Sequence, residues 1–399
     1  MNGSLHRKLC LIVFVFVALT VTAMGADQFT PVLVSTVSPP TGAVLGTDGK
    51  RHVLYELMLT NANPTPATLQ KIDVVDASNP SHIVAAYEGN SLQSQLRTLG
   101  KTPVTNASIE FNGARVFLVQ LAFDQGAPVP QRLLHRITLF GGDLPAPTPQ
   151  TAVRLQYTVA PVEIQMKVLV IGPPLKGGRW VAMNGCCDAN GAHRPSSQTV
   201  NGGLYFAQRF AIDWMRLDDQ GRLLNGDASN VHSYVAYGAD VLSVADGIVV
   251  AVLDTLDDQT PGALPDLKSM SLETVNGNNV ILDLGGGTFA FYAHLEHKSV
   301  TVAVGDHVKR GQILGKLGNS GNTSAPHLHF HIMGSPSVLG ADGLPYVIDT
   351  FKFEGEIPAA KFAASPTLEG SWNEKMLQTP SPRHDQFPLD YTIIDFSSQ

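Results

Sequence analysis

The sequence predicts a mainly β protein with two domains, a β-sandwich of the immunoglobulin-like type followed by an antiparallel β domain. The 37 glycines and 26 prolines favour frequent turns and short strands over long helices. In the first half, short apolar segments such as 51–60 and 115–123 alternate with clusters of Gly, Pro and Asn, which is the spacing of a β-sandwich. The length of 399 residues favours two domains over one.

Residues 1–25 have the pattern of a secretory signal peptide. Residues 6–8 are basic, and the apolar run that follows, 9–21, has 13 residues, which is short for a membrane span. Ala23 and Gly25 are the small residues of a cleavage site. We therefore expect an exported protein, periplasmic or extracellular, with no membrane span after signal removal; an uncleaved N-terminal anchor is the alternative.

The expected organisation has three further parts. Residues 26–172 form the β-sandwich, of unknown binding role, and Pro173 and Pro174 mark the boundary to a second domain, 173–350. The remainder, 351–399, is rich in Pro and Ser and is expected to be a wrap or a partly ordered extension. The net charge is −7 and no basic run follows the signal, which argues against a nucleic-acid partner.

Removal of the signal leaves two cysteines, the adjacent Cys186 and Cys187. Neighbouring Cα atoms lie about 3.8 Å apart, below the usual range of a disulfide, so two free thiols are predicted. A vicinal disulfide or a transient metal contact is the alternative.

Three histidines alternate with apolar residues in the strand-like segment 326–332. Because successive side chains of a strand point to opposite faces, His327, His329 and His331 share one face, which predicts a metal site. Asp213 lies in an apolar segment, where a carboxylate must be paired, hydrogen-bonded or metal-bound to stay charged.

The second half carries several motifs in one order: Phe210–Asp213, Val244–Val249, Phe291–Leu295, Gly305–Gly315, Gly318–Gly321 and Pro326–His329. From about residue 184 to 332 the chain thereby resembles the M23 family of zinc metallopeptidases, the LytM and lysostaphin-like enzymes. The resemblance implies a secreted endopeptidase that hydrolyses peptide bonds of bacterial peptidoglycan with a single zinc. Carried over, Asp213 and His329 are zinc ligands, and His294 and His327 are the two catalytic histidines.

One position departs from the family pattern. The family places its first zinc-binding histidine four residues before the aspartate, where this chain has Arg209, which stays protonated and cannot ligate zinc. We predict that His193, in the long polar loop 180–203, supplies this ligand, with His232 as a weaker substitute. Arg209 would then lie near the cleft and contact a substrate carboxylate, or pair with an acidic residue nearby.

Two other functions stay open from the sequence. A degenerate LytM-type module could bind or activate another cell-wall hydrolase, and the N-terminal sandwich could itself bind carbohydrate or the cell wall. Because all the motifs follow Pro173, residues 173–399 are expected to fold and bind zinc on their own.

Overall fold

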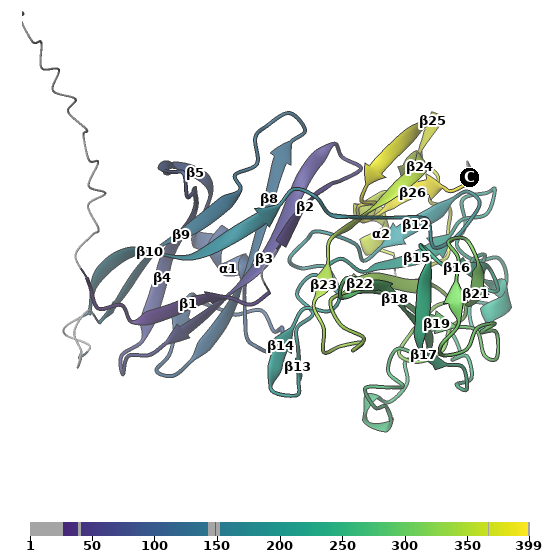
Figure 1. The fold of residues 1–399 in the computed structure, drawn as a ribbon, viewed down its shortest axis with the longest axis horizontal. Helices are drawn as coiled ribbons and strands as arrows, with labels where there is room; N and C mark the ends of the chain where they lie inside the picture. Colours follow the sequence, from purple (N-terminus) through teal and green to yellow (C-terminus); the bar gives the residue numbers. More distant parts are fainter. Residues whose placement is uncertain (1–26, 39–40, 143–147, 149–151, 366, 398–399) are drawn as a thin grey trace, which may run out of the picture.

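The computed structural model describes residues 27–38, 41–142, 148, 152–365 and 367–397 (Figure 1). The predicted signal peptide lies outside these residues, so export stays a prediction. In the described part of the chain, no helix is long and apolar enough to cross a membrane. Strands predominate and the helices are short, which confirms the mainly β prediction.

The first half of the chain forms a ten-stranded sheet with the order β5-β4-β9-β10-β2-β3-β8-β6, in which β1 also pairs with β3 and β7 with β4. Its elements are β1 (Val32–Thr36), β2 (Thr41–Leu45), β3 (Lys50–Asn61), β4 (Ala67–Asp76), β5 (Asn79–Glu88), α1 (Gly89–Gln95), β6 (Leu96–Arg97), β7 (Ser108–Ile109), β8 (Ala114–Asp124), β9 (Arg132–Gly142) and β10 (Ala152–Gln165). We call this the first sheet.

The first sheet folds over on itself around one apolar core. Strands β3 and β9 are not neighbours in the sheet, yet Tyr55 Oη of β3 lies 2.8 Å from Nε2 of His135 on β9. Both strands contribute alternate residues, such as Leu57 and Ile137, to the same buried cluster. The arrangement has two packed layers; the immunoglobulin-like topology stays a prediction.

The second half forms a twelve-stranded sheet with the order β11-β24-β26-β12-β15-β22-β19-β18-β17-β20, in which β23 pairs with β22 and β25 with β24. Its strands are β11 (Leu169–Ile171), β12 (Trp180–Met183), β15 (Ile212–Arg216), β17 (Gly247–Leu253), β18 (Asn278–Gly285), β19 (Thr288–Leu295), β20 (His307–Val308), β22 (Leu328–Met333), β23 (Gly343–Leu344), β24 (Tyr346–Glu356), β25 (Lys375–Gln386) and β26 (Thr392–Asp395). Beside this second sheet lie the pairs β13 (Gln198–Val200) with β14 (Gly203–Tyr205) and β16 (Asp240–Leu242) with β21 (Ile313–Lys316), and the short helices η2 (Val231–Ser233), η3 (Leu267–Ser269) and α2 (Ala359–Ala363).

The C-terminal residues, expected to form a wrap or a partly ordered extension, contain two strands of the second sheet. Strand β26 pairs with both β12 and β24 inside the second sheet, and its Ile393 and Ile394 are fully buried. Strand β25 pairs with β24 but is mostly exposed. Because an exposed strand needs no apolar run, the sequence of this region carries a weak strand signal.

The two sheets share a buried interface, where β2 lies against β24 and β25 (Figure 1). Strand β3 turns Val53 and Tyr55 into the core of the first sheet, so that Leu54 and Glu56 face the other way. Leu54 belongs to the same buried cluster as Phe210 and Tyr346 of the second half. The first sheet is therefore packed directly onto the part of the chain that holds the motifs.

Candidate metal centre

Two paired strands position Asp213 and His329. Strands β15 and β22 run antiparallel with Asp213 directly opposite His329, and Nδ1 of His329 lies 2.8 Å from Oδ1 of Asp213. Both side chains are buried. Strand β19 pairs with the other edge of β22 and ends just after His294, which has the left-handed φ of 62°. A non-glycine residue in this conformation is uncommon, and such residues cluster at functional sites.

The loop between β12 and β13 brings His193 to the same point. Its Nε2 lies 3.3 Å from Oδ2 of Asp213, while its Nδ1 donates a hydrogen bond to the carbonyl of Ala211 at 3.2 Å. Because a carbonyl only accepts, Nδ1 carries the proton and Nε2 is left to face the carboxylate. Asn184 Nδ2 donates to the same Oδ2 at 2.8 Å and helps to orient it.

His193, Asp213 and His329 have the composition and spacing of a zinc site. Their candidate donor atoms all lie within 4.8 Å of one another. Two ligands at about 2.0–2.2 Å from a tetrahedral zinc are about 3.3–3.5 Å apart, so the His193–Asp213 separation fits and the His329–Asp213 separation is slightly short. Nε2 of His329 lies 3.0 Å from Nδ1 of His331, the kind of outer partner that fixes a metal-bound imidazole.

His294 and His327 lie side by side at the edge of this cluster, with ring centroids 4.7 Å apart. Nδ1 of His294 donates to the carbonyl of Ser320, and Nδ1 of His327 to that of Ala325, each at 2.8 Å. In the described part of the chain neither Nε2 has a hydrogen bond to the backbone, and that of His327 lies 3.4 Å from Asp213. The structure thus brings together every histidine and carboxylate that the sequence assigned to the metal and to catalysis.

The charges of the cluster centre on Asp213. Burial raises the pKa of Asp213, but attraction to His193 and His327 outweighs this and holds that pKa well below the usual value. Burial lowers the pKa of His193 and of His327, but Asp213 outweighs it and raises both. Burial, followed by repulsion from His327 and His329, depresses the pKa of His294 well below that of free histidine. Asp213 is accordingly an anion and His294 a neutral imidazole at pH 7.

The cluster opens into a cavity of about 540 Å³ that several segments line. Besides the site residues, it is lined by Lys101, from the turn between β6 and β7 of the first sheet, and by Phe362 and Leu368, from the C-terminal region. Lys101 is the single lysine or arginine among the lining residues that the structure describes. The cavity is therefore composite, with walls from both halves of the chain.

Arg209 lies elsewhere, and its partner is an acidic residue of the chain, the alternative to the expected contact with substrate. It does not line this cavity, and its guanidinium is buried, with Nη1 donating to Glu56 at 2.7 Å and Nη2 to the carbonyl of Gly343 at 3.0 Å. His232 is exposed, packs against Tyr237 and is not part of the metal cluster. The sequence did not predict Asn184, Lys101 or Glu56, since no local motif marks residues whose partners are distant in sequence.

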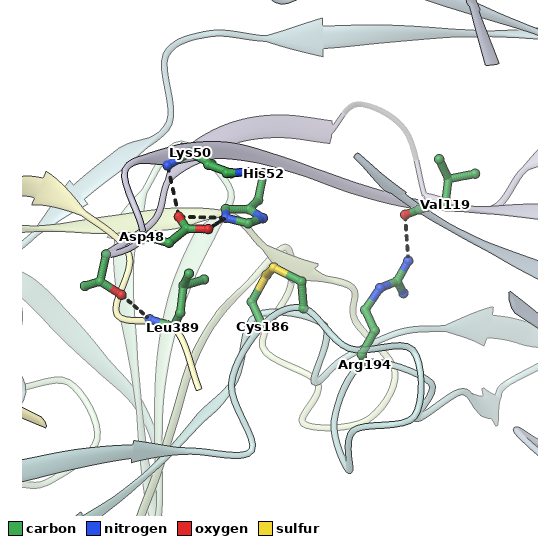
Figure 2. The surroundings of a disulfide bond; sticks show 9 residues. Asp48, Lys50, His52, Val119, Cys186, Arg194 and Leu389 are labelled. Atoms are coloured by element: carbon green, nitrogen blue, oxygen red, sulfur yellow. Dashed lines mark hydrogen bonds and ion pairs between the residues drawn. A yellow bond between two sulfur atoms is a disulfide. The ribbon is translucent and has the colours of Figure 1, made fainter. Parts of the chain in front are cut away.

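Cys186 and Cys187 form a disulfide, which corrects the prediction of two free thiols. The prediction assumed a trans peptide, whereas the peptide between these residues is cis and their Cα atoms lie 3.0 Å apart. Figure 2 shows the disulfide beside His52 of β3, whose ring lies 3.1 Å from Asp48. The disulfide thus belongs to the loop that carries His193 and lies beside the first sheet.

Three candidate metal ligands with two histidines beside them are an arrangement that is typical of metal-dependent hydrolases. Comparison with known families agrees: residues 229–339 match the model of Peptidase family M23. This match confirms the resemblance inferred from the motifs and includes His294, His327 and His329. Residues 193 and 213 precede the matched segment, so their place in the site rests on the geometry given above.

Similar proteins include the peptidoglycan DD-endopeptidase ShyC of Vibrio cholerae, which is 33% identical over 67 residues. That alignment spans 17% of this chain and only 15% of the length of the relative. The solved catalytic domain of lysostaphin from Staphylococcus simulans is 26% identical, with 37% of this chain and 80% of that chain covered and a TM-score of 0.22. A zinc-containing peptidase from Vibrio cholerae is 14% identical, with 76% and 85% covered and a TM-score of 0.20.

Proposed function

We propose that this protein is an exported zinc metalloendopeptidase that hydrolyses peptide bonds of bacterial peptidoglycan. The observation that carries the proposal is the meeting of His193, Asp213 and His329 at one point of a cavity, beside His294 and His327. The family match and the named activity of the relative from Vibrio cholerae support the reaction and the substrate class.

Each residue of the cluster has a chemical role in this proposal. His193 through Nε2, Asp213 through its carboxylate and His329 through Nδ1 would hold the zinc, which would supply a Lewis acid for the scissile carbonyl and lower the pKa of a water. His294 and His327 present Nε2 atoms free of backbone contacts. One of them accepts the proton of the attacking water, and the other donates to the developing oxyanion or to the leaving amine.

The alternative, a degenerate module that activates another hydrolase, drew its support from Arg209 at the position of the first zinc ligand. The 3.3 Å separation between His193 and Asp213 removes most of that support, because His193 can serve as the third zinc ligand in place of residue 209. Both catalytic histidines are also in place. We therefore favour an enzyme over a regulatory module.

The His193→Ala variant tests the proposal, with His232→Ala as its control. A zinc titration against a competing chelator and the digestion of purified sacculi are measured on the full chain. We expect His193→Ala to weaken zinc binding by more than the roughly 10–100-fold that loss of an outer partner costs, and to abolish digestion. His232→Ala should match the wild type. Wild-type zinc affinity and hydrolysis in His193→Ala would contradict the assignment of this ligand.

A further inference from the structure

Glu56 is a buried carboxylate that joins the first sheet to the second half of the chain. It is fully buried on β3, and each of its oxygens accepts a hydrogen bond from a different arginine. Arg194 Nη1 lies 2.5 Å from Oε1 and Arg209 Nη1 lies 2.7 Å from Oε2. Both arginine side chains are only 1% exposed. We call Glu56, Arg194 and Arg209 the interface triad.

The triad is held by backbone acceptors on both sides of the interface. Arg194 Nη2 donates to the carbonyl of Tyr55 at 3.0 Å and to that of Val119 at 3.2 Å, the second of which is visible in Figure 2. Arg209 donates instead to Gly343 of the second half. A buried charge without such partners would cost several kcal/mol, so the geometry of both arginines is firmly specified.

The two arginines lie in different kinds of local structure. Arg209 precedes β15, and the position of Asp213 on β15 is fixed by pairing with both β12 and β22. Arg194 directly follows His193 in a segment, 184–197, that contains no strand. Most backbone hydrogen bonds of this segment are short-range, such as Ser196 N to the carbonyl of His193, and one reaches the C-terminal region, from Asp390 N to the carbonyl of Cys186.

Further contacts from the first sheet hold the same segment. Arg97 Nη2 donates to the carbonyl of Ala189 at 2.8 Å, and Ser197 Oγ donates to the carbonyl of Leu99 at 2.8 Å. With Arg194, these contacts tether the segment before, at and after His193. The loop that carries this ligand is thus anchored on the first sheet at three points.

We propose that Glu56, acting through Arg194, is a positioning residue for His193, so that the first sheet completes the metal site of the second half. The inference rests on the proposed function, in which His193 is a zinc ligand. Residues that orient a metal ligand raise affinity because the ligand need not be ordered when the metal binds. Without this anchor, His193 would have to be fixed at the moment of zinc binding.

The matched variants Arg194→Met and Arg209→Met, made in the full chain, test this role. Each removes one arginine from Glu56 and keeps a long side chain, but only Arg194 is linked to the His193 loop. We expect Arg194→Met to bind zinc about 10–100-fold more weakly than the wild type, and Arg209→Met to stay within about threefold. The visible absorption spectrum of the Co²⁺ form should change only in Arg194→Met, because the spectrum reports the ligand geometry.

Thermal unfolding of the metal-free variants gives the stability of each, so that loss of folding is separated from loss of zinc. If Arg194→Met does not fold, Arg194→Lys takes its place; it keeps the charge but cannot reach all three acceptors, and should show the same loss to a smaller degree. Equal zinc affinities in the Arg194 and Arg209 variants would overturn the positioning role alone. Absence of zinc binding by the wild-type chain would overturn the proposed function itself.

Discussion

The candidate site has a half built on strands and a half built on loops. Asp213 and His329 lie opposite each other on paired strands, and His294 ends the strand that pairs with the other edge of β22. His193 and Lys101 instead lie on loops: the loop of His193 is hydrogen-bonded to the first sheet, and Lys101 follows β6. One half of the site is therefore set by backbone pairing within the second sheet, whereas the other half requires side-chain contacts between a loop and the first sheet.

Removal of the first sheet should break the loop half most severely. In a fragment of residues 173–399, Arg194 would lose Glu56 as a partner, and the apolar surface around Phe210 would be exposed to water. We now expect this fragment to aggregate or to bind zinc far more weakly than the full chain, contrary to the expectation from the sequence. Size-exclusion chromatography, thermal unfolding and a zinc titration on both proteins measure the difference.

A monomeric fragment that unfolds cooperatively and binds zinc like the full chain would contradict this prediction. It would mean that segment 184–197 is positioned by the second sheet alone. The distinction between a strand half and a loop half that depends on the first sheet would then have no physical basis.

The strand half is best tested at His294. Its Nδ1 is hydrogen-bonded to the carbonyl of Ser320, and within the described residues no hydrogen bond or ion pair joins it to Asp213. Because His294 is proposed to carry a proton and not the metal, His294→Ala should keep its zinc and lose about 10²–10⁴-fold in kcat. Turnover of a synthetic stem peptide and the zinc content of the purified variant are the two measurements. His307→Ala, a change at an exposed histidine of β20, is the control and should behave as the wild type.

A zinc-free His294→Ala protein would show that the division between ligands and proton carriers is wrong. The same result in the His307→Ala control would point to general damage to the fold.

The strand half of the site was also the half that the sequence could predict. Alternation along 326–332 places His327 and His329 on one face, and a charged Asp213 among apolar neighbours requires a partner, so a local pattern is enough. His193 was inferred only as a replacement for a missing ligand. Neither the burial of Arg209 nor its pairing with Glu56, 153 positions away, leaves any trace in a local pattern.

The fold, too, has features that the sequence could predict and features that it could not. Strands with alternating or continuous apolar residues were predictable, as was the mainly β class. The exposed strand β25 and the disulfide between Cys186 and Cys187 were not. The former carries little apolar signal, and the latter depends on a backbone conformation that composition does not reveal.

The smallest expected effect concerns Lys101, the cation in the loop half of the cavity. Stem peptides of peptidoglycan carry free carboxylates, and an exposed ion pair contributes about 0.2–1 kcal/mol. Lys101→Ala should therefore raise KM about two- to fivefold and leave kcat unchanged, because the contact is made equally in the ground state and the transition state. Added salt should reduce the difference from wild type, since an exposed pair is screened.

Lys298→Ala is a matched control, because both lysines have left-handed backbones, with φ of 64° and 57°, but Lys298 does not line the cavity. Equal KM values in the two variants would show that Lys101 makes no contact with the substrate, and that the first sheet contributes no charge to its binding.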